Sequence, residues 1–208
     1  MNILCIDCSN GLNLMLCANK VWYKHIDHEQ KKQSDNLLEK IDDLLGEAKL
    51  DIKKINVIAV CVGPGSFTGI RVAISTAKGL AIGSGAKIVT FSSFDTIKDL
   101  PENNYAAIVD GFGNNYYYKI KKFGRVFEGC NNLESINILL DGIKLYTNSK
   151  SVYNKNNQYD IVLAEYDATK TVASEIEAKK FILTNQIAPL YLRASQAEIE
   201  RQKNGNKV

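Results

Sequence analysis

The sequence predicts an α/β protein made of two similar halves, each a mixed five-stranded sheet flanked by helices. Apolar runs typical of strands alternate with segments whose apolar residues recur at helical spacing. Each half opens with a strand, an acidic turn and two further strands, and a polar hinge at 101–104 separates the two openings. This repeat indicates an internal duplication, with a first lobe at 1–98 and a second, reduced lobe with a C-terminal tail at 99–208.

The first half is expected to hold five strands and two helices. Leucine and isoleucine recur at helical spacing over 35–46, and a second helix is expected to end near Ile82. Polar or glycine residues follow each of these segments and mark the turns between them. The predicted strands are Ile3–Cys8, Leu12–Ala18, Val21–Ile26, 57–62 and Lys87–Phe91.

The second half is expected to repeat this order. We predict helices over Leu133–Ile143 and Ala168–Phe181, a loop over the asparagine-rich residues 148–158, and a frayed end after Arg201. The predicted strands are Tyr105–Asp110, Tyr116–Phe123, Arg125–Gly129, Leu145–Thr147 and Ile161–Ala164.

Composition and charge exclude several classes of function. The 208 residues are 45% hydrophobic and 24% charged, as in ordinary globular proteins, and a net charge of +3 does not by itself indicate nucleic-acid binding. No apolar run reaches the ~20 residues of a membrane span, and the N-terminus lacks a basic leader. We therefore expect a cytoplasmic protein without membrane contact.

The cysteines and histidines do not form a metal-binding pattern. The five cysteines are odd in number and lie mostly in apolar runs, which is typical of reduced, buried thiols. Cys5 and Cys8 form one Cys-x-x-Cys without a second pair, and their odd spacing places them on opposite faces of a strand. His25 and His28 have the same odd spacing. The sequence predicts no metal site.

The most informative segment is a glycine-rich turn that follows the fourth strand and opens the second helix. It is not a P-loop, because Ile70 and Arg71 stand where Lys and Ser/Thr are required, and it lacks the Rossmann glycine spacing. Its glycines permit a sharp turn or a close approach, and its hydroxyls can cap the helix. Two interpretations stay open: a loop that binds an anion, and a structural elbow. The turn consists of Gly63, Pro64, Gly65, Ser66, Phe67, Thr68 and Arg71.

The helix after this turn carries a ridge of small residues. Gly69, Ala73, Ala77 and Ala81 are four positions apart, so they line one side of the helix and lower its surface. A second element can therefore approach closely, with Ile70 as apolar surface beside the ridge. The sequence leaves open whether that element belongs to this chain or to another protein.

These motifs resemble a known family. Two halves that open with a strand, an aspartate and a hairpin resemble the actin, sugar-kinase and heat-shock ATPase superfamily. Within it, four segments are similar to the TsaB family of bacterial proteins needed to make threonylcarbamoyladenosine in tRNA. The central two are the specific ones. The segments are 3–9, 63–71, 76–81 and the closing Pro189-Leu190-Tyr191-Leu192-Arg193.

The resemblance implies a subunit without catalytic residues of its own. Such a protein would support modification of the adenosine next to the anticodon in tRNAs that read A-starting codons. It would form a heterodimer with the catalytic paralogue TsaD, recruit the ATPase TsaE, and self-associate when isolated. The resemblance implies a contact with tRNA that is indirect, or leaves that contact undefined. The implied docking surface joins the small-residue ridge, with Ile70, to Leu38 and Ile41 of the preceding helix.

The resemblance also implies where a nucleotide would bind, although two departures argue against some family properties. Asp7, Ser9, Asn10 and Asp110 stand where the superfamily handles Mg-ATP, and ATP or ADP could otherwise lie at the partner interface. The paralogue's metal-binding His-x-x-x-His pair is replaced by 33–38, which contains no histidine. The second acidic turn lacks the family's arginines, so an anion there could be held only by backbone N–H groups.

Two further functions remain as alternatives. A metal-dependent, glycoprotease-like hydrolase would need ligands that the sequence does not supply. A small-molecule kinase of the same fold would need a base beside the hydroxyl of its substrate, and no acid in the sequence is marked for that role.

Overall fold

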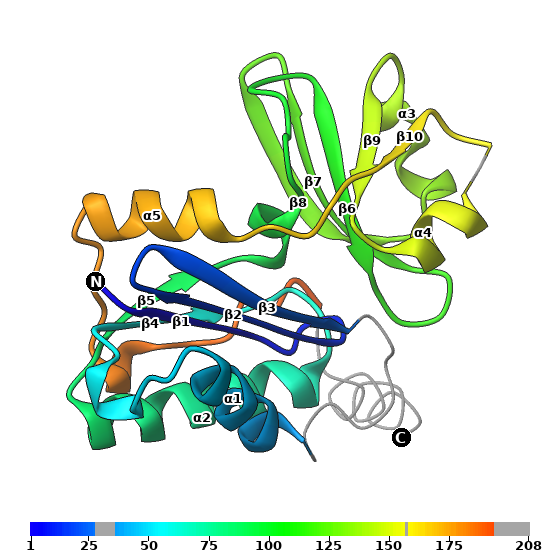
Figure 1. The fold of residues 1–208 in the computed structure, drawn as a ribbon. Helices are drawn as coiled ribbons and strands as arrows, with labels where there is room; N and C mark the ends of the chain where they lie inside the picture. Colours follow the sequence, from blue (N-terminus) through cyan, green and yellow to red (C-terminus); the bar gives the residue numbers. More distant parts are fainter. Residues whose placement is uncertain (28–35, 157, 194–208) are drawn as a thin grey trace, which may run out of the picture.

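The computed structural model describes residues 1–27, 36–156 and 158–193. It contains two five-stranded sheets, each the centre of one lobe (Figure 1). None of the helices in these ranges is both long and apolar enough to cross a membrane. His28, Gln33, the start of the first predicted helix and the tail from Arg201 lie outside the described residues.

The two sheets share one topology, which confirms the predicted duplication. In the first lobe the order is β3-β2-β1-β4-β5, and in the second it is β8-β7-β6-β9-β10. The central strand of each sheet pairs antiparallel with the next strand in sequence, which in turn pairs antiparallel with the third, and the other side of the central strand pairs in parallel. The bounds are β1 Ile3–Asp7, β2 Leu12–Ala18, β3 Val21–Asp27, β4 Val57–Cys61, β5 Lys87–Phe91, β6 Tyr105–Asp110, β7 Tyr116–Lys122, β8 Arg125–Asn131, β9 Lys144–Thr147 and β10 Ile161–Leu163.

The first sheet is covered on both faces (Figure 1). Helices α1 (Leu37–Glu47) and α2 (Phe67–Ser84) cover one face, and their apolar residues join those of β1, β2 and β4 in one buried cluster. Helix α5 (Thr169–Glu177) covers the other face. Because both faces are buried, all five residues of β1 and of β4 are buried, as their continuous apolar runs predict.

The C-terminal part of the chain returns to the first lobe. Val172 of α5 is buried among residues of β1, β2, β4 and β5, and Ile182 pairs with Ile88 at the edge of the sheet. The predicted lobe boundary at residue 98 places these residues in the second lobe. The second sheet begins after residue 98 as expected, but α5 and the residues that follow it pack on the first sheet because they bury the face that α1 and α2 leave open.

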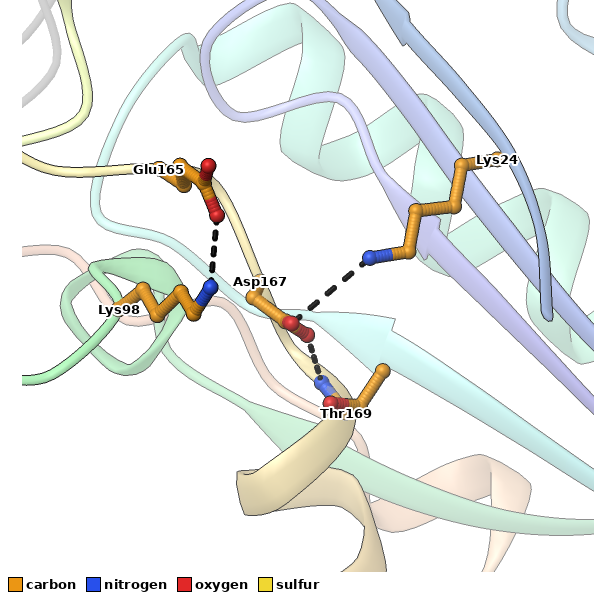
Figure 2. Close-up of polar contacts among 5 residues, drawn as sticks. All are labelled: Lys24, Lys98, Glu165, Asp167 and Thr169. Carbon is orange, nitrogen blue, oxygen red and sulfur yellow. Dashed lines mark hydrogen bonds and ion pairs between the residues drawn. The ribbon is translucent and has the colours of Figure 1, made fainter.

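Two short segments cross between the lobes and carry charged side chains (Figure 2). The N–H of Asp167 donates to Thr96 O at 2.8 Å, and Lys98 Nζ lies 2.7 Å from Glu165 Oε2. Asp167 also accepts from the Thr169 N–H at 2.8 Å and lies 3.7 Å from Lys24 Nζ of β3. These contacts attach the start of α5 to the first lobe.

The predicted elements of the second lobe need three corrections. The loop expected over 148–158 contains helix α4 (Lys150–Lys155), because Ser149 caps it by accepting from the Val152 N–H. The helix predicted over 133–143 is shorter: a 3-10 turn precedes α3 (Asn137–Leu140), and Gly142 adopts a φ of +71° just beyond it. The last predicted helix ends at Glu177, because Lys179 has a φ of +53°.

Candidate functional site

The glycine-rich turn between β4 and α2 is clamped onto the turn after β1. Gly65 has a φ of +155°, and a Cβ at this position would lie 2.3 Å from Ser9 O. The Ser66 N–H donates to the same carbonyl at 2.7 Å, while Ser66 Oγ accepts from the Gly69 N–H at 3.2 Å. Close approach to protein backbone therefore accounts for Gly65, which supports the structural-elbow interpretation.

Two other segments support the turn from behind. The Ser93 N–H and hydroxyl donate to Gly63 O at 2.9 Å and Pro64 O at 2.5 Å. On the other side the Leu190 N–H donates to Val62 O at 2.7 Å. A Cβ at Gly63, whose φ is +101°, would lie 2.7 Å from Ile70 Cδ1. The turn fixes the direction of α2, while Thr68 is exposed.

The small-residue ridge of α2 faces inward, which corrects the predicted docking surface. Ala73 and Ala77 have no exposed surface, Ala81 is 4% exposed and Gly69 is buried. They belong to the cluster that packs α2 on the first sheet, where small side chains let the helix lie close to the strands. A ridge covered by its own lobe cannot contact a second protein.

Of the other predicted interface residues only Leu38 is accessible. Leu38 is 60% exposed, whereas Ile41 and Ile70 are 2% and 1% exposed and belong to the core. The outward side of α2 carries a different set of small residues, Ser75, Gly79 and Gly83, again four apart, with Ile82 at 75% exposure beside them. A Cβ at Gly79 or Gly83 would meet no atom within 4 Å.

The aspartate at the end of β1 is enclosed by its own lobe. Asp7 is 1% exposed; its Oδ1 accepts from the Ser9 N–H at 2.8 Å and its Oδ2 from the Tyr166 hydroxyl at 2.9 Å. Burial, and then the Asp7 carboxylate, raise the pKa of Tyr166 well above its ordinary value, so the tyrosine stays a donor. A carboxylate held in this way does not fit a magnesium ion on a nucleotide, which needs an accessible ligand.

The second acidic turn meets the first across the two lobes. Asn10 Nδ2 donates to Asp110 Oδ2 at 3.4 Å, and the Ser149 hydroxyl donates to the same oxygen. The four predicted nucleotide residues therefore lie in one region, with Asn10 and Asp110 in direct contact. Their hydrogen bonds are made within the chain, and no group of three or more His, Cys, Asp or Glu suited to a metal occurs in the described ranges.

Sequence reasoning missed two residues of this region, Tyr166 and Ser149. Tyr166 is 159 positions from Asp7 and Ser149 is 39 from Asp110, and no local motif marks either one. Ser9 Oγ and Asn13 Oδ1 are also buried here, without a hydrogen-bond partner among the described residues.

The two arginines singled out by the sequence both contact aromatic rings. Arg71 lies 4.3 Å from the centroid of Phe67 and donates through Nε to the Tyr191 hydroxyl at 3.0 Å. Arg193 lies 5.5 Å from the centroid of Phe112, in the β6–β7 turn. This contact joins Arg193 to the second lobe.

Comparisons with known proteins agree with the architecture. Residues 27–137 match the family described as TsaD, tRNA N6-adenosine threonylcarbamoyltransferase. A Pseudomonas aeruginosa structure described as similar to the peptidase YeaZ superposes with a TM-score of 0.73 at 20% identity, over 92% of this chain and 99% of that one. Together with the sheets, these matches show an actin-like ATPase fold.

Curated relatives resemble a shorter part of the chain. The Escherichia coli protein named tRNA threonylcarbamoyladenosine biosynthesis protein TsaB is 30% identical over 98 residues, which are 47% of this chain and 42% of that protein. The Bacillus subtilis protein of the same name is 33% identical over 100 residues, 47% of this chain and 43% of that protein. The match thus spans less than half the length of these relatives.

Proposed function

Since the chain belongs to the TsaD family and resembles its TsaB members, we propose that it is a non-catalytic subunit in threonylcarbamoyl modification of tRNA. The modified adenosine is the one next to the anticodon in tRNAs that read A-starting codons. The protein acts by forming a heterodimer with TsaD and recruiting the ATPase TsaE. Its contact with tRNA is indirect, and it works in the cytoplasm.

The enclosed Asp7 carboxylate is the observation that carries this proposal. A kinase or ATPase of this fold needs its acidic turns open to a metal–phosphate complex, whereas Asp7 is 1% exposed and held by Ser9 and Tyr166. Asp110 is likewise occupied by Asn10 and Ser149. The duplicated fold keeps both aspartates, but its own side chains occupy them and so block access of a metal–phosphate complex. Such a protein is suited to assembling with partners rather than to catalysing a reaction. ATP or ADP, where needed, is bound at the interface with the partner.

The outward side of the first-lobe helices is the proposed TsaD interface. Leu38 of α1 and Ile82 of α2 are large apolar residues exposed by 60% and 75%. On α2, next to Ile82, the exposed Ser75, Gly79 and Gly83 leave the backbone open to close contact. Two helices that present apolar and small residues side by side are suited to packing against a related helix pair. This surface replaces the buried ridge.

Reconstitution with TsaD, TsaE and unmodified tRNA from the same organism, supplied with an activated threonylcarbamoyl donor and ATP, tests the proposal. We expect threonylcarbamoyl transfer only when TsaD and this chain are both present, and a TsaD complex by size exclusion with mass measurement. The isolated chain should hydrolyse ATP at background rate. Its mass, from the same size-exclusion measurement, shows whether it forms a homodimer when TsaD is absent. Product formation by the isolated chain, or a wild-type chain that fails to bind TsaD, would overturn the proposal.

Matched variants test the interface. Leu38→Asp and Ile82→Asp place charges on the proposed surface and should weaken TsaD binding by about tenfold or more each. Ile138→Asp changes a residue that is 90% exposed on α3 of the other lobe, and should bind as the wild type does. Equal effects of all three substitutions would show that the interface lies elsewhere.

A further inference from the structure

We propose that Arg71 is a prepositioned anchor for a carboxylate side chain of the docking partner. This inference rests on the proposed function and names the chemistry by which one end of that interface recognises its partner. It depends on how Arg71 is held, on the lack of an acidic partner for it among the described residues, and on its position relative to the outward side of α2.

Two aromatic residues, Phe67 and Tyr191, hold the Arg71 side chain in place. The rings of Phe67 and Tyr191 stack with their centroids 4.2 Å apart and an interplanar angle of 7°. The Arg71 guanidinium lies 4.3 Å from the Phe67 centroid and 5.8 Å from that of Tyr191. Its Nε donates to the Tyr191 hydroxyl at 3.0 Å, across 120 positions of sequence. A guanidinium oriented in this way loses little conformational entropy on binding.

Among the described residues, no carboxylate pairs with Arg71. The ion pairs found among residues 1–27, 36–156 and 158–193 all involve lysines, and none includes Arg71. A guanidinium has five N–H donors, and the Tyr191 hydroxyl accepts from only the one on Nε. The exposed side chain therefore keeps the paired terminal donors that match the two oxygens of a carboxylate.

The position of Arg71 places this group at the end of the proposed interface. Arg71 is four residues before Ser75, so it continues the row formed by Ser75, Gly79 and Gly83 on the outward side of α2. Arginine is enriched among the residues that dominate binding energy at protein interfaces. An oriented arginine at one end of an apolar helix surface would fix the register of a docked helix pair.

A protein carboxylate fits this site better than a phosphate does. The backbone N–H of Ser66, at the start of the same helix, already donates to Ser9 O, and the Gly69 N–H donates to Ser66 Oγ. One guanidinium beside apolar side chains suits a single planar carboxylate. A polyphosphate normally requires several donors from the backbone as well.

Charge reversal and charge-retaining variants test this role in the full chain. We expect Arg71→Glu to weaken TsaD binding at 50 mM salt by about thirtyfold or more, and Arg71→Lys to weaken it several-fold, because lysine keeps the charge but loses the planar fork. Arg71→Gln should bind with less dependence on salt than the wild type. Arg125→Glu, on β8 of the other lobe, is the matched control and should bind normally.

The outcomes separate this inference from the proposed function. Normal binding by Arg71→Glu, together with loss of binding by Leu38→Asp, would overturn the anchor and leave the subunit role in place. Absence of binding by the wild type would overturn the subunit role itself. Competition by ADP or inorganic phosphate that disappears in Arg71→Gln would identify a phosphate as the occupant and overturn the carboxylate assignment. Thermal unfolding of each variant checks that it folds.

Discussion

Asn10 and Asp110 are one hundred positions apart, and the Asn10 amide donates to Asp110 Oδ2 at 3.4 Å. Because Asn10 lies in the turn after β1 and Asp110 is the last residue of β6, this hydrogen bond joins the equivalent strand ends of the two halves. Here the turns contact each other directly, and the contact contributes to the stability of the lobe arrangement.

The role of Asp110 can be measured by unfolding. Asp110→Ala removes the acceptor for both Asn10 and Ser149, and should lower the free energy of unfolding by about 1.5–3 kcal/mol in urea titrations. Asp160→Ala is the control: within the described residues the Asp160 carboxylate makes a long, exposed ion pair of 3.8 Å with Lys144, so its loss should change stability by less than about 1 kcal/mol. Equal losses in the two variants would contradict the assigned role.

The turn glycine provides a second test. Gly65→Ala places a Cβ 2.3 Å from Ser9 O at a φ of +155°, so we expect a loss of more than about 2 kcal/mol in the free energy of unfolding. Gly46→Ala, in α1, meets no atom within 4 Å and should gain up to about 1 kcal/mol from helix propensity. Differential scanning calorimetry should show opposite shifts in Tm. A Gly65→Ala protein as stable as the wild type would exclude the close packing described for this turn.

Thiol accessibility tests the placement of the cysteines. Cys5, Cys8, Cys17 and Cys61 are buried, and Cys130 is partly exposed. Burial, and then the Asp7 carboxylate, raise the pKa of Cys8 to about 12, so it is protonated at neutral pH. A thiol reagent at pH 8 should modify Cys130 in the folded protein and all five cysteines after unfolding. Rapid modification of more than one thiol in the folded protein would contradict this burial.

The Asp167 contacts predict a dependence of stability on pH. Burial opposes ionisation of Asp167, but the backbone and side chain of Thr169, with Lys24 and Lys98, outweigh it and lower its pKa below the ordinary 3.8 (Figure 2). The folded state therefore binds this proton less readily than the unfolded state. The resulting stability is present above about pH 4 and disappears as the pH falls through the folded pKa.

Urea titrations at pH 6 and pH 3 measure this effect. From pH 6 to pH 3 the free energy of unfolding should fall less in Asp167→Asn than in the wild type. The difference should be at most about 1 kcal/mol, because solvent screens this partly exposed group. Asp160→Asn should follow the wild type, since its ion pair is long and exposed. If the free energy of unfolding of the wild type falls by no more than that of Asp167→Asn between these pH values, the contacts of Asp167 with Thr169 and Lys24 do not stabilise its ionised form.

Most of the fold could be predicted from sequence because the strands are marked by local patterns. Buried strands such as β1 and β4 are continuous apolar runs, and their bounds match the prediction within about a residue. Helix α4 was missed because it has only six residues, and its capping serine lies in an asparagine-rich stretch. Short helices leave too few positions for a periodic pattern.

The candidate site was harder to predict, since its decisive features depend on tertiary contacts. Helix α2 has small residues on two sides, and local sequence did not distinguish the inward row at Ala73 from the outward row at Gly79. The closure of Asp7 by Tyr166 depends on the returning C-terminal segment. The inward ridge was taken for a docking surface and Asp7 for a nucleotide-binding residue, because the sequence does not reveal which segments pack over them.

The return of α5 to the first sheet has a consequence for biosynthesis. Strands β1, β2, β4 and β5 are all made before residue 92, yet the apolar face formed by Met15, Val89 and Phe91 is covered by a helix that starts at Thr169. On the ribosome this surface stays unprotected until most of the polypeptide has emerged. Nascent chains that stall within the second lobe should therefore be strong clients for chaperones, and premature stop codons there should yield aggregates rather than a truncated functional lobe.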